Sequence, residues 1–378
     1  MPMLFYLFVI ACLGSLFPTV GYAKDLVVGV NFVVPGHLSV PEQNAVLTAM
    51  KSAGVRVIRA PLTPDDKGLD FAKRAYAQDI QIDWIVDLKF RSDAPRRTPE
   101  EMEQYDVWDA APLSSADPEQ FRVYVSTFLE QLEQNGIVLA GFELGNEINT
   151  PSYNGDFALP GEGKVLGLND LYYDPEGQRI ARGYLQYLKV LGVLKDVRDR
   201  SRLNQGTPVI SGGLTVGMEE GSHPAMKKDA VTLNATLQFW RANGLDELVD
   251  AYGVHVYPWA DEPGQPGAAA ERQARLEKFS LAECRPARDG RPCWITEWGF
   301  RYEDQTCPPS DEDRHYLLIR ELMGDFRAEA ARGRVTGLFY FAWNKDSWQR
   351  NLGMPWNLDR CGPLTESGRL AIDGSALR

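Results

Sequence analysis

Short apolar segments alternate with segments of helical periodicity along most of this chain. The apolar segments are bounded by Gly, Pro, Asn, Asp or Ser, a pattern typical of buried strands. The predicted strands are residues 26–33, 55–60, 82–88, 139–144, 207–213, 249–257, 292–297 and 337–344. The predicted helices are residues 41–53, 71–78, 117–132, 180–194, 230–243, 268–279 and 311–331. Residues 151–170 lie between a strand and a helix and are interpreted as a long glycine-containing loop.

The order of these elements predicts the fold class. Eight strands separated by helices, without tandem hairpins, indicate a parallel sheet. The number of strands and the chain length favour a closed (β/α)₈ TIM barrel with outer helices over an open sheet. No Gly-x-Gly-x-x-Gly follows the first strand, which argues against a dinucleotide-binding fold. Residues 24–378 are therefore expected to form a single domain.

Polar and aromatic residues mark the carboxyl ends of the predicted strands, the edge at which barrels of this kind place their active sites. Two strands end in a glutamate, Glu147 after Gly145-Asn146 and Glu297 before Trp298-Gly299. The residues at these ends are Arg59, Asn146, Glu147, His255, Tyr257, Glu297 and Trp343. We expect them to gather at one site. Glu143, two residues before Gly145, is expected instead to pair with a lysine or arginine inside the protein.

These motifs, in this order, resemble those of the clan A glycoside hydrolases, which are retaining glycosidases on (β/α)₈ barrels. The resemblance rests on Gly145-Asn146-Glu147, His255-Val256-Tyr257-Pro258 and Thr296-Glu297-Trp298-Gly299, together with Arg59 and Trp343. It covers the chain from the first strand to the eighth. No histidine follows the third strand, and Ile148 rather than proline follows Glu147. The resemblance therefore does not choose between family 5, family 39 and a less studied family of the clan.

The resemblance implies a role for each strand-end residue. Glu147 matches the general acid/base and Glu297 the nucleophile of a two-carboxylate mechanism, in which one carboxyl is protonated and the other is ionised. Asn146 matches the residue that binds the sugar 2-hydroxyl, and Trp343 the floor of the subsite at the cleaved bond. Arg59 and Tyr257 match residues that orient the nucleophile. His255 is expected beside the carboxylates.

Aromatic residues on the carboxyl-end loops are expected to stack on sugar rings. Trp259, Trp298 and Trp343 are assigned this role, whereas tryptophans within helices and strands are expected in the core: Trp84, Trp240 and Trp294. The expected partner is thus a polysaccharide or oligosaccharide.

Charge and spacing exclude several other classes of function. The net charge of −12 and a pI near 5.0 argue against a nucleic-acid partner, because no basic stripe is available for phosphates. Glu147, His255 and Glu297 could ligate a metal, but no His-x-His or Asp-rich segment supports this. The sequence contains no Gly-x-Ser-x-Gly motif, which argues against a Ser-His-Asp hydrolase. No cofactor is expected, and the protein is expected to be a monomer.

The amino-terminal residues and the cysteines predict export. Residues 1–23 carry no charge, are apolar, and end in Gly21-Tyr22-Ala23, a pattern typical of a cleaved signal peptide. The alternatives are an uncleaved membrane anchor and a lipoprotein signal at Cys12. After cleavage no stable membrane insertion is expected, and the protein would be secreted or periplasmic. Four cysteines then remain, an even number that favours two disulfides. Of the three possible pairings we favour Cys284–Cys293 and Cys307–Cys361.

Taken together, the sequence predicts an exported retaining β-glycosidase that hydrolyses a polysaccharide or oligosaccharide. The alternatives are a carbohydrate-binding protein on an inactive glycosidase barrel and a metal-dependent hydrolase on the same barrel. The two intact glutamates argue against the inactive barrel.

Overall fold

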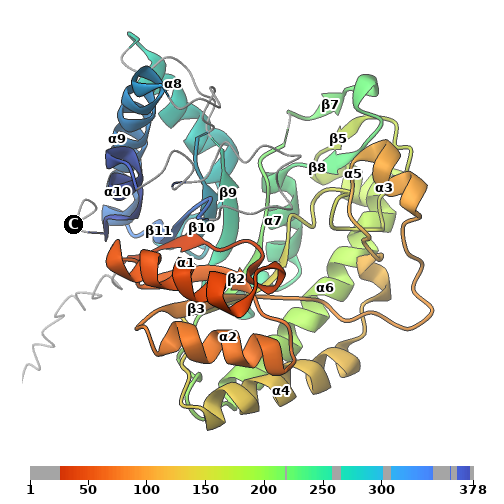
Figure 1. Ribbon diagram of the computed structural model, residues 1–378. Coiled ribbons are helices and arrows are strands. Elements are labelled where there is room, and N and C mark those ends of the chain that lie inside the picture. Colours follow the sequence, from red (N-terminus) through yellow and green to blue (C-terminus); the bar gives the residue numbers. More distant parts are fainter. Residues whose placement is uncertain are drawn as a thin grey trace, which may run out of the picture.

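The computed structural model describes residues 26–217, 219–257, 265–300, 308–343, 358 and 364–374. Its main sheet has eight parallel strands surrounded by helices, which confirms the predicted (β/α)₈ barrel (Figure 1). The barrel strands are β1 (Val27–Asn31), β2 (Val57–Pro61), β3 (Gln81–Val86), β4 (Gly141–Asn146), β6 (Val209–Gly213), β9 (Tyr252–Val256), β10 (Cys293–Trp298) and β11 (Val335–Tyr340). Each corresponds to one of the eight predicted strands, with ends that differ by a few residues.

The sheet runs in the order β6-β4-β3-β2-β1-β11-β10-β9, and its two outer strands meet. The Leu214 N–H donates to the Gly253 carbonyl at 3.1 Å, and the His255 N–H donates to the Leu214 carbonyl at 2.8 Å. Isolated bridges pair Ile210 with Ala251 and Leu214 with Val254 in parallel. These contacts close the barrel, so β6 and β9 do not present open edges where they meet.

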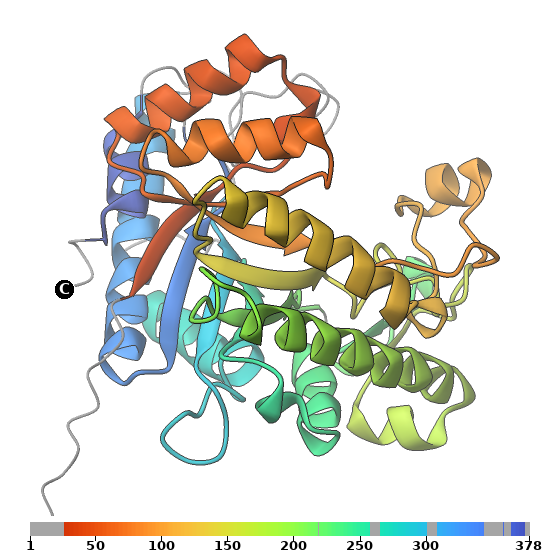
Figure 2. The same ribbon diagram turned by 90° about the horizontal axis from the view of Figure 1, so that it is seen from below.

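Helices surround the strands on the outside of the barrel (Figure 2). The α-helices are α1 (Val40–Ser52), α2 (Asp66–Tyr76), α3 (Pro99–Tyr105), α4 (Pro118–Gln134), α5 (Leu168–Tyr173), α6 (Pro175–Asp199), α7 (Leu233–Ala242), α8 (Ala268–Arg275), α9 (Pro309–Ala331) and α10 (Glu366–Ile372). Short 3₁₀ turns are η1 (Pro35–His37), η2 (Leu113–Ser115), η3 (Pro224–Met226) and η4 (Leu245–Glu247), and η5 (Leu276–Ser280) is a π turn. Helix α4 begins as expected, because Asp117 accepts hydrogen bonds from the N–H groups of Glu119 and Gln120.

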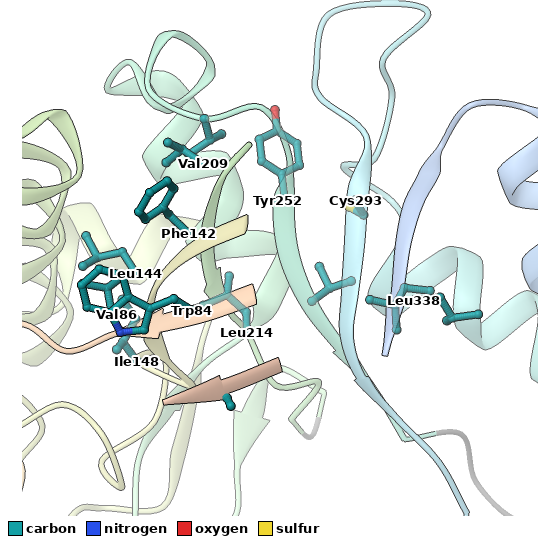
Figure 3. Close-up of a cluster of buried hydrophobic side chains, with 14 of the residues drawn as sticks. Trp84, Val86, Phe142, Leu144, Ile148, Val209, Leu214, Tyr252, Cys293 and Leu338 are labelled. Carbon is teal, nitrogen blue, oxygen red and sulfur yellow. The ribbon is translucent and has the colours of Figure 1, made fainter. Parts of the chain in front are cut away.

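The main core lies between the strands and the outer helices. Trp84 of β3 is fully buried and packs edge-on against Phe128 of α4, with ring centroids 5.2 Å apart. Phe142 of β4 lies beside it, on the same side of the sheet (Figure 3). Trp240 stacks on Tyr187 at 4.8 Å. The predicted core positions of Trp84, Trp240 and Trp294 are confirmed, since none is more than 3% exposed.

A second, smaller core fills the inside of the barrel near the amino ends of the strands. It consists of the buried residues Val57, Ile210, Ala251, Trp294 and Phe339. Trp294 and Phe339 provide its two rings, 5.5 Å apart. A β-carbon on Gly337 would lie only 2.4 Å from the Trp294 ring, so glycine at this position lets the indole enter the barrel. The apolar layer closes the bottom of the barrel beneath the polar residues described below.

The interpretation of residues 151–170 as a plain loop is wrong. This segment contains strand β5 (Lys164–Leu166) and the start of α5. Strand β5 pairs antiparallel with β7 (Gly221–Ser222) and parallel with β8 (Ala230–Val231), forming a small second sheet. Its partners lie more than fifty residues away, and three residues give too short a pattern to predict a strand by themselves.

A disulfide joins Cys284 to Cys293, with a Cα–Cα distance of 5.5 Å, which confirms one of the two expected pairings. Cys307 and Cys361 lie outside the described residues, as do residues 1–23 and Trp259. None of the described helices combines the length and the apolar character needed to cross a membrane.

Candidate active site

Strand alternation turns a set of polar residues into the barrel. On β3 and β4, Trp84 and Phe142 point outward to α4, so their neighbours Asp83 and Glu143 point inward. On β2, Arg59 lies between the buried Ile58 and Ala60 and also faces the barrel interior, where it contacts Glu143. The barrel interior is therefore polar above the apolar layer at its bottom.

Arg59 is the centre of this polar interior and uses all five of its N–H donors. Its Nε and Nη2 bind the two oxygens of Glu143 at 2.5 and 3.0 Å. Nη1 donates to Asn31 Oδ1 at 2.8 Å and to Glu297 Oε1 at 2.6 Å, and Nη2 also donates to Asn146 Oδ1 at 2.7 Å. Burial would lower the pKa of Arg59, but Glu143 and Glu297 outweigh it, so the pKa lies above its ordinary value. The guanidinium stays charged and fixed in place.

The expected pairing of Glu143 with a basic residue is confirmed, and Arg59 is that residue. Glu143 also accepts a hydrogen bond from the Gly213 N–H at 2.7 Å. Arg59 therefore bridges two inner carboxylates, Glu143 and Glu297.

Glu297 is held from two sides. Arg59 contacts Oε1, and the Tyr257 hydroxyl donates to Oε2 at 2.5 Å. Burial, the Glu297 charge and this hydrogen bond raise the pKa of Tyr257 well above its ordinary value, so the phenol keeps its proton. Glu297 itself is only 8% exposed. An anionic carboxylate is thus fixed at the carboxyl end of β10 with its charge balanced by Arg59.

Glu147 comes from a turn at the end of β4. Gly145 and Glu147 both have positive φ angles, 78° and 45°, and the Glu147 N–H donates to the Gly213 carbonyl at 2.8 Å. A non-glycine residue in this conformation is uncommon and is found preferentially at functional sites. The Glu147 side chain is 23% exposed, more than the Glu297 side chain, which is 10% exposed. Glu147 is therefore the carboxylate that can reach a leaving group or water more easily.

His255 lies between the two glutamates. Its Nδ1 is 2.9 Å from Glu147 Oε1 and 3.5 Å from Glu297 Oε2. One ligand atom from each of Glu147, His255 and Glu297 lies within 4.8 Å of the others. Burial acts to lower the pKa of His255, but the charge of Glu297 and the hydrogen bond with Glu147 outweigh it, so the pKa is raised. Its Nε2 is buried without a hydrogen-bond partner among the described residues.

Asn146 and Trp343 lie at strand ends beside this cluster. Asn146 accepts from Arg59 through Oδ1, and none of the described residues accepts a hydrogen bond from its Nδ2, so the amide can donate to a ligand hydroxyl. The Trp343 N–H donates to the carbonyl of Asn31 at 2.9 Å, which anchors the end of β11 to β1. Its ring is 4% exposed. Contact between this ring and a sugar stays a prediction.

The expected contact between Trp298 and a sugar has to be corrected. Trp298 follows Glu297 on the same strand, so its side chain points the opposite way. The ring is fully buried and packs edge-on against Phe326 of α9 and Tyr340 of β11, with centroids 5.2 and 5.0 Å away. No face of it is open to a ligand. Trp298 belongs to the core between β10, β11 and α9.

Three further residues contact the cluster or lie near it, and strand-end reasoning did not select them. Asn31 at the end of β1 accepts from Arg59 and donates to the carbonyls of Thr296 and Tyr340, at 2.9 and 3.2 Å. Tyr153, in the loop after β4, has a pKa raised by burial and by the charges of Glu147 and Glu297. Trp108, in the loop after β3, is 47% exposed and hydrogen-bonds to Tyr153. Asn31 lies within a predicted strand and could have been selected. Tyr153 lies in the long loop after the fourth predicted strand, where an aromatic residue can form a wall of the site, whereas Trp108 carries no local signal.

The cluster of Glu147, His255 and Glu297 has the residue types of a metal site. However, both oxygens of Glu297 already accept hydrogen bonds, one of them from the Arg59 guanidinium. A cation bound to that carboxylate would meet an immediate positive charge and displace at least one donor. The donor set therefore fits an ion-paired carboxylate better than a metal ligand.

Solved structures of several glycoside hydrolases share the closed (β/α)₈ fold of this chain. One is the exo-β-1,4-mannosidase Op5Man5 from Opitutaceae bacterium strain TAV5, with a TM-score of 0.54 and 14% identity. The similarity covers 93% of this chain and 60% of that one, so the present chain spans less than two thirds of the length of the mannosidase.

Two others are similar over most of their length. The GH5_18 E140A protein from Bifidobacterium longum has a TM-score of 0.53 and 14% identity, covering 93% of this chain and 78% of that one. The β-glucosidase from Thermotoga maritima has a TM-score of 0.51 and 11% identity, covering 92% and 96%. At sequence identities this low, the structural similarity shows only that these proteins share a fold with this chain. No family model and no curated protein sequence matches the chain.

Proposed function

We propose that this protein is an exported retaining β-glycosidase that cleaves a polysaccharide or oligosaccharide. The observation that carries the proposal is the pair Glu147 and Glu297, which lie side by side but have different partners. One oxygen of each lies within 4.8 Å of the other, close to the spacing of roughly 5 Å that retaining enzymes use. Glu297 is held by Arg59 and Tyr257, whereas Glu147 contacts His255.

Glu297 acts as the nucleophile. Two donors fix its carboxylate, and the Arg59 guanidinium stabilises its negative charge. It attacks the anomeric carbon, forms a bond between that carbon and its own oxygen, and expels the leaving-group oxygen. Glu147 gives its proton to that oxygen as the bond breaks.

In the second step Glu147 takes a proton from water, and the water oxygen displaces Glu297 from the anomeric carbon. The sugar leaves with its original configuration, and both glutamates return to their starting states. His255, 2.9 Å from Glu147, is placed to hold a hydrogen bond to that carboxyl in both steps. The free amide of Asn146 donates to a sugar hydroxyl next to the reacting carbon.

The substrate class and the compartment rest on separate observations. The neighbours of the fold include a β-1,4-mannosidase and a β-glucosidase, which is why we propose a β-linkage. The Cys284–Cys293 disulfide joins two fully buried sulfurs and is of a kind that persists in oxidising compartments. Together with the apolar segment at residues 1–23, it supports export.

The first test is an activity panel of glucans, mannans, xylans and galactans, with released products identified by mass spectrometry. The second separates the two glutamates. In Glu147→Ala, an aryl glycoside with a dinitrophenyl leaving group should still form the glycosyl-enzyme, which then accumulates as a burst. Azide should restore turnover and give a β-glycosyl azide, because attack on the intermediate keeps the configuration. In Glu297→Ala, azide enters from the nucleophile's side and should give the α-azide.

Glu130→Ala is the matched control, since Glu130 is an exposed carboxylate on the outer helix α4. Its kinetics should equal those of the unmodified protein. An inverted azide from Glu147→Ala would show that the two roles are exchanged, and inverted product from the unmodified enzyme would refute the retaining mechanism. If the protein binds glycans but releases no product from any of them, this result supports the alternative of an inactive carbohydrate-binding barrel.

A further inference from the structure

A cavity of about 340 Å³ lies at the loop that follows β6. Its walls come from three parts of the chain: the β6 loop (Val216, Gly217, Glu219 and Glu220), the first turn of α7, and Lys278 with Phe279 in η5. The loop follows the carboxyl end of β6, so the cavity opens on the same face of the barrel as Glu147 and Glu297. Its volume is within the range of small-ligand sites.

A second, narrower cavity of about 40 Å³ shares part of its lining with the first, since Val216 and Phe279 line both. Tyr257, whose hydroxyl binds Glu297, also lines the narrower cavity. The shared lining residues therefore connect the larger cavity to the residue that holds Glu297.

The polar groups of the cavity are mainly acceptors. Asn234 uses its Nδ2 to bind the Lys278 carbonyl at 2.9 Å, which leaves Oδ1 buried without a partner among the described residues. The Lys278 ammonium pairs with Glu219 at 3.0 Å, and no ion pair to Glu220 occurs in the described part of the chain. A ligand must therefore supply hydrogen-bond donors to Asn234 and Glu220.

The charge and the apolar surface of the cavity further restrict the class of ligand that fits it. Two carboxylates and one ammonium give the lining a negative balance, which disfavours an anionic ligand such as a uronic acid or a sulfated sugar. The Phe279 ring adds an apolar surface, with the Lys278 ammonium 4.5 Å from its centroid. Hydroxyl donors combined with C–H faces that pack on an aromatic ring are properties of a neutral sugar.

We infer that this cavity is an additional sugar-binding subsite, which binds a neutral sugar unit of a polymeric substrate away from the cleaved bond. The inference rests on the proposed glycosidase function and deepens it, because it assigns the protein to chain-like neutral substrates rather than to short glycosides. Phe279 provides the packing surface, and Asn234 and Glu220 accept hydrogen bonds from the hydroxyls.

The test compares substrates of different length. Full-length Phe279→Ala and Asn234→Ala are assayed on reduced β-1,4-linked manno-, gluco- and xylo-oligosaccharides, from disaccharides to hexasaccharides, and on the matching dinitrophenyl monosaccharides. We expect kcat/KM on the pentasaccharide and hexasaccharide to fall about tenfold in each variant, since one aromatic or buried polar contact is worth roughly that factor. Activity on the aryl monosaccharides should not change, which also shows that the variants are folded.

Tyr76→Ala is the control, because Tyr76 is a partly exposed aromatic residue at the end of α2 and lines neither cavity. It should match the unmodified protein on every substrate. Equal loss on short and long substrates, or no loss on either, overturns the subsite while leaving the glycosidase function intact. A preference of the unmodified protein for acidic oligosaccharides, removed by Lys278→Ala, overturns the neutral ligand.

Failure of the proposed function gives a different result. If no substrate is hydrolysed, binding is measured by the retardation of the protein in gels that contain soluble mannan, glucan or xylan. Retardation that is lost in Phe279→Ala and kept in Tyr76→Ala supports the subsite without catalysis. Retardation that is equal in both variants, or absent for all three polymers, overturns it.

Discussion

Arg59 Nη1 lies 2.6 Å from Glu297 Oε1, although the two residues are 238 positions apart in the chain. The contact joins β2 to β10 across the inside of the barrel. Because Arg59 also binds Glu143, Asn31 and Asn146, the position of Glu297 depends on four strands at once. This one ion pair links the stability of the barrel to the geometry of the site.

Replacing Arg59 by lysine should lower both the stability of the barrel and the activity of the site. Lysine keeps the charge but has three donors on one nitrogen and cannot reach all the groups that Arg59 binds. We expect kcat to fall by about 100-fold or more, and the free energy of unfolding to fall by about 3 kcal/mol because buried carboxylates lose their partner. Steady-state kinetics and urea unfolding measure the two effects. Arg200→Lys, at an exposed arginine that pairs with Asp196, should change stability by less than about 0.5 kcal/mol and leave kcat intact. Normal turnover in a folded Arg59→Lys protein would refute the link.

The raised pKa of His255 predicts a pH dependence of stability. A histidine whose pKa is raised on folding stabilises the protein fully below its ordinary value near 6.5, and this contribution is lost as the pH rises through the folded value. The stability difference between the unmodified protein and His255→Asn should therefore shrink as the pH rises from about 6.5. Thermal unfolding of both proteins over a series of buffers measures this difference. A difference that stays constant or grows with pH would contradict the charged contact with the glutamates.

Asp83 should also make the stability depend on pH, because its ionised form is destabilised in the folded protein. It is fully buried, and neither carboxylate oxygen has a hydrogen-bond partner among the described residues. Burial, together with the nearby Glu143 charge, raises its pKa well above the ordinary 3.8, so the folded protein holds a proton that the unfolded chain releases. Stability is lost as the pH rises from about 3.8 towards the folded value. Asp83→Asn removes this loss.

The stability advantage of Asp83→Asn should accordingly grow with pH, by at most about 1.4 kcal/mol per unit. Denaturant unfolding at several pH values gives the slope directly. Asp79→Asn, at an exposed residue, is the control and should show no comparable slope. If Asp83→Asn were most advantageous at low pH, Asp83 would have to be ionised in the folded protein.

The two tryptophans at the ends of β10 and β11 should respond differently to truncation. Trp298→Ala removes a ring from a closed core and should cost about 3–5 kcal/mol of unfolding free energy, with normal kinetics in the folded fraction. Trp343→Ala should lower both substrate affinity and kcat if the ring carries the sugar at the cleaved bond. Melting temperatures and kinetics of the two variants distinguish the roles. A Trp343→Ala protein that is destabilised but kinetically normal would assign that ring to the core as well.

Local sequence patterns determined the eight strands, most of the outer helices and the residues at the strand ends. A buried strand needs only a run of apolar residues, and a parallel barrel brings all its carboxyl ends to one face. For that reason Arg59, Asn146, Glu147, His255 and Glu297 could be expected together before any contact was known. The pairing of Cys284 with Cys293 also followed from the sequence, because the loop between them is short.

Only the tertiary structure decided which of these groups touch and which way each side chain points. Trp298 and Glu297 are neighbours in sequence, yet alternation along β10 sends one into the outer core and the other into the site. The positions of Tyr153 and Trp108, and the cavity at Phe279, depend on contacts between loops that are far apart in the sequence. The small sheet of β5, β7 and β8 likewise forms between distant segments. Local periodicity reports whether a residue is buried, but contact between distant segments is set by how the whole barrel closes, and no local pattern encodes that.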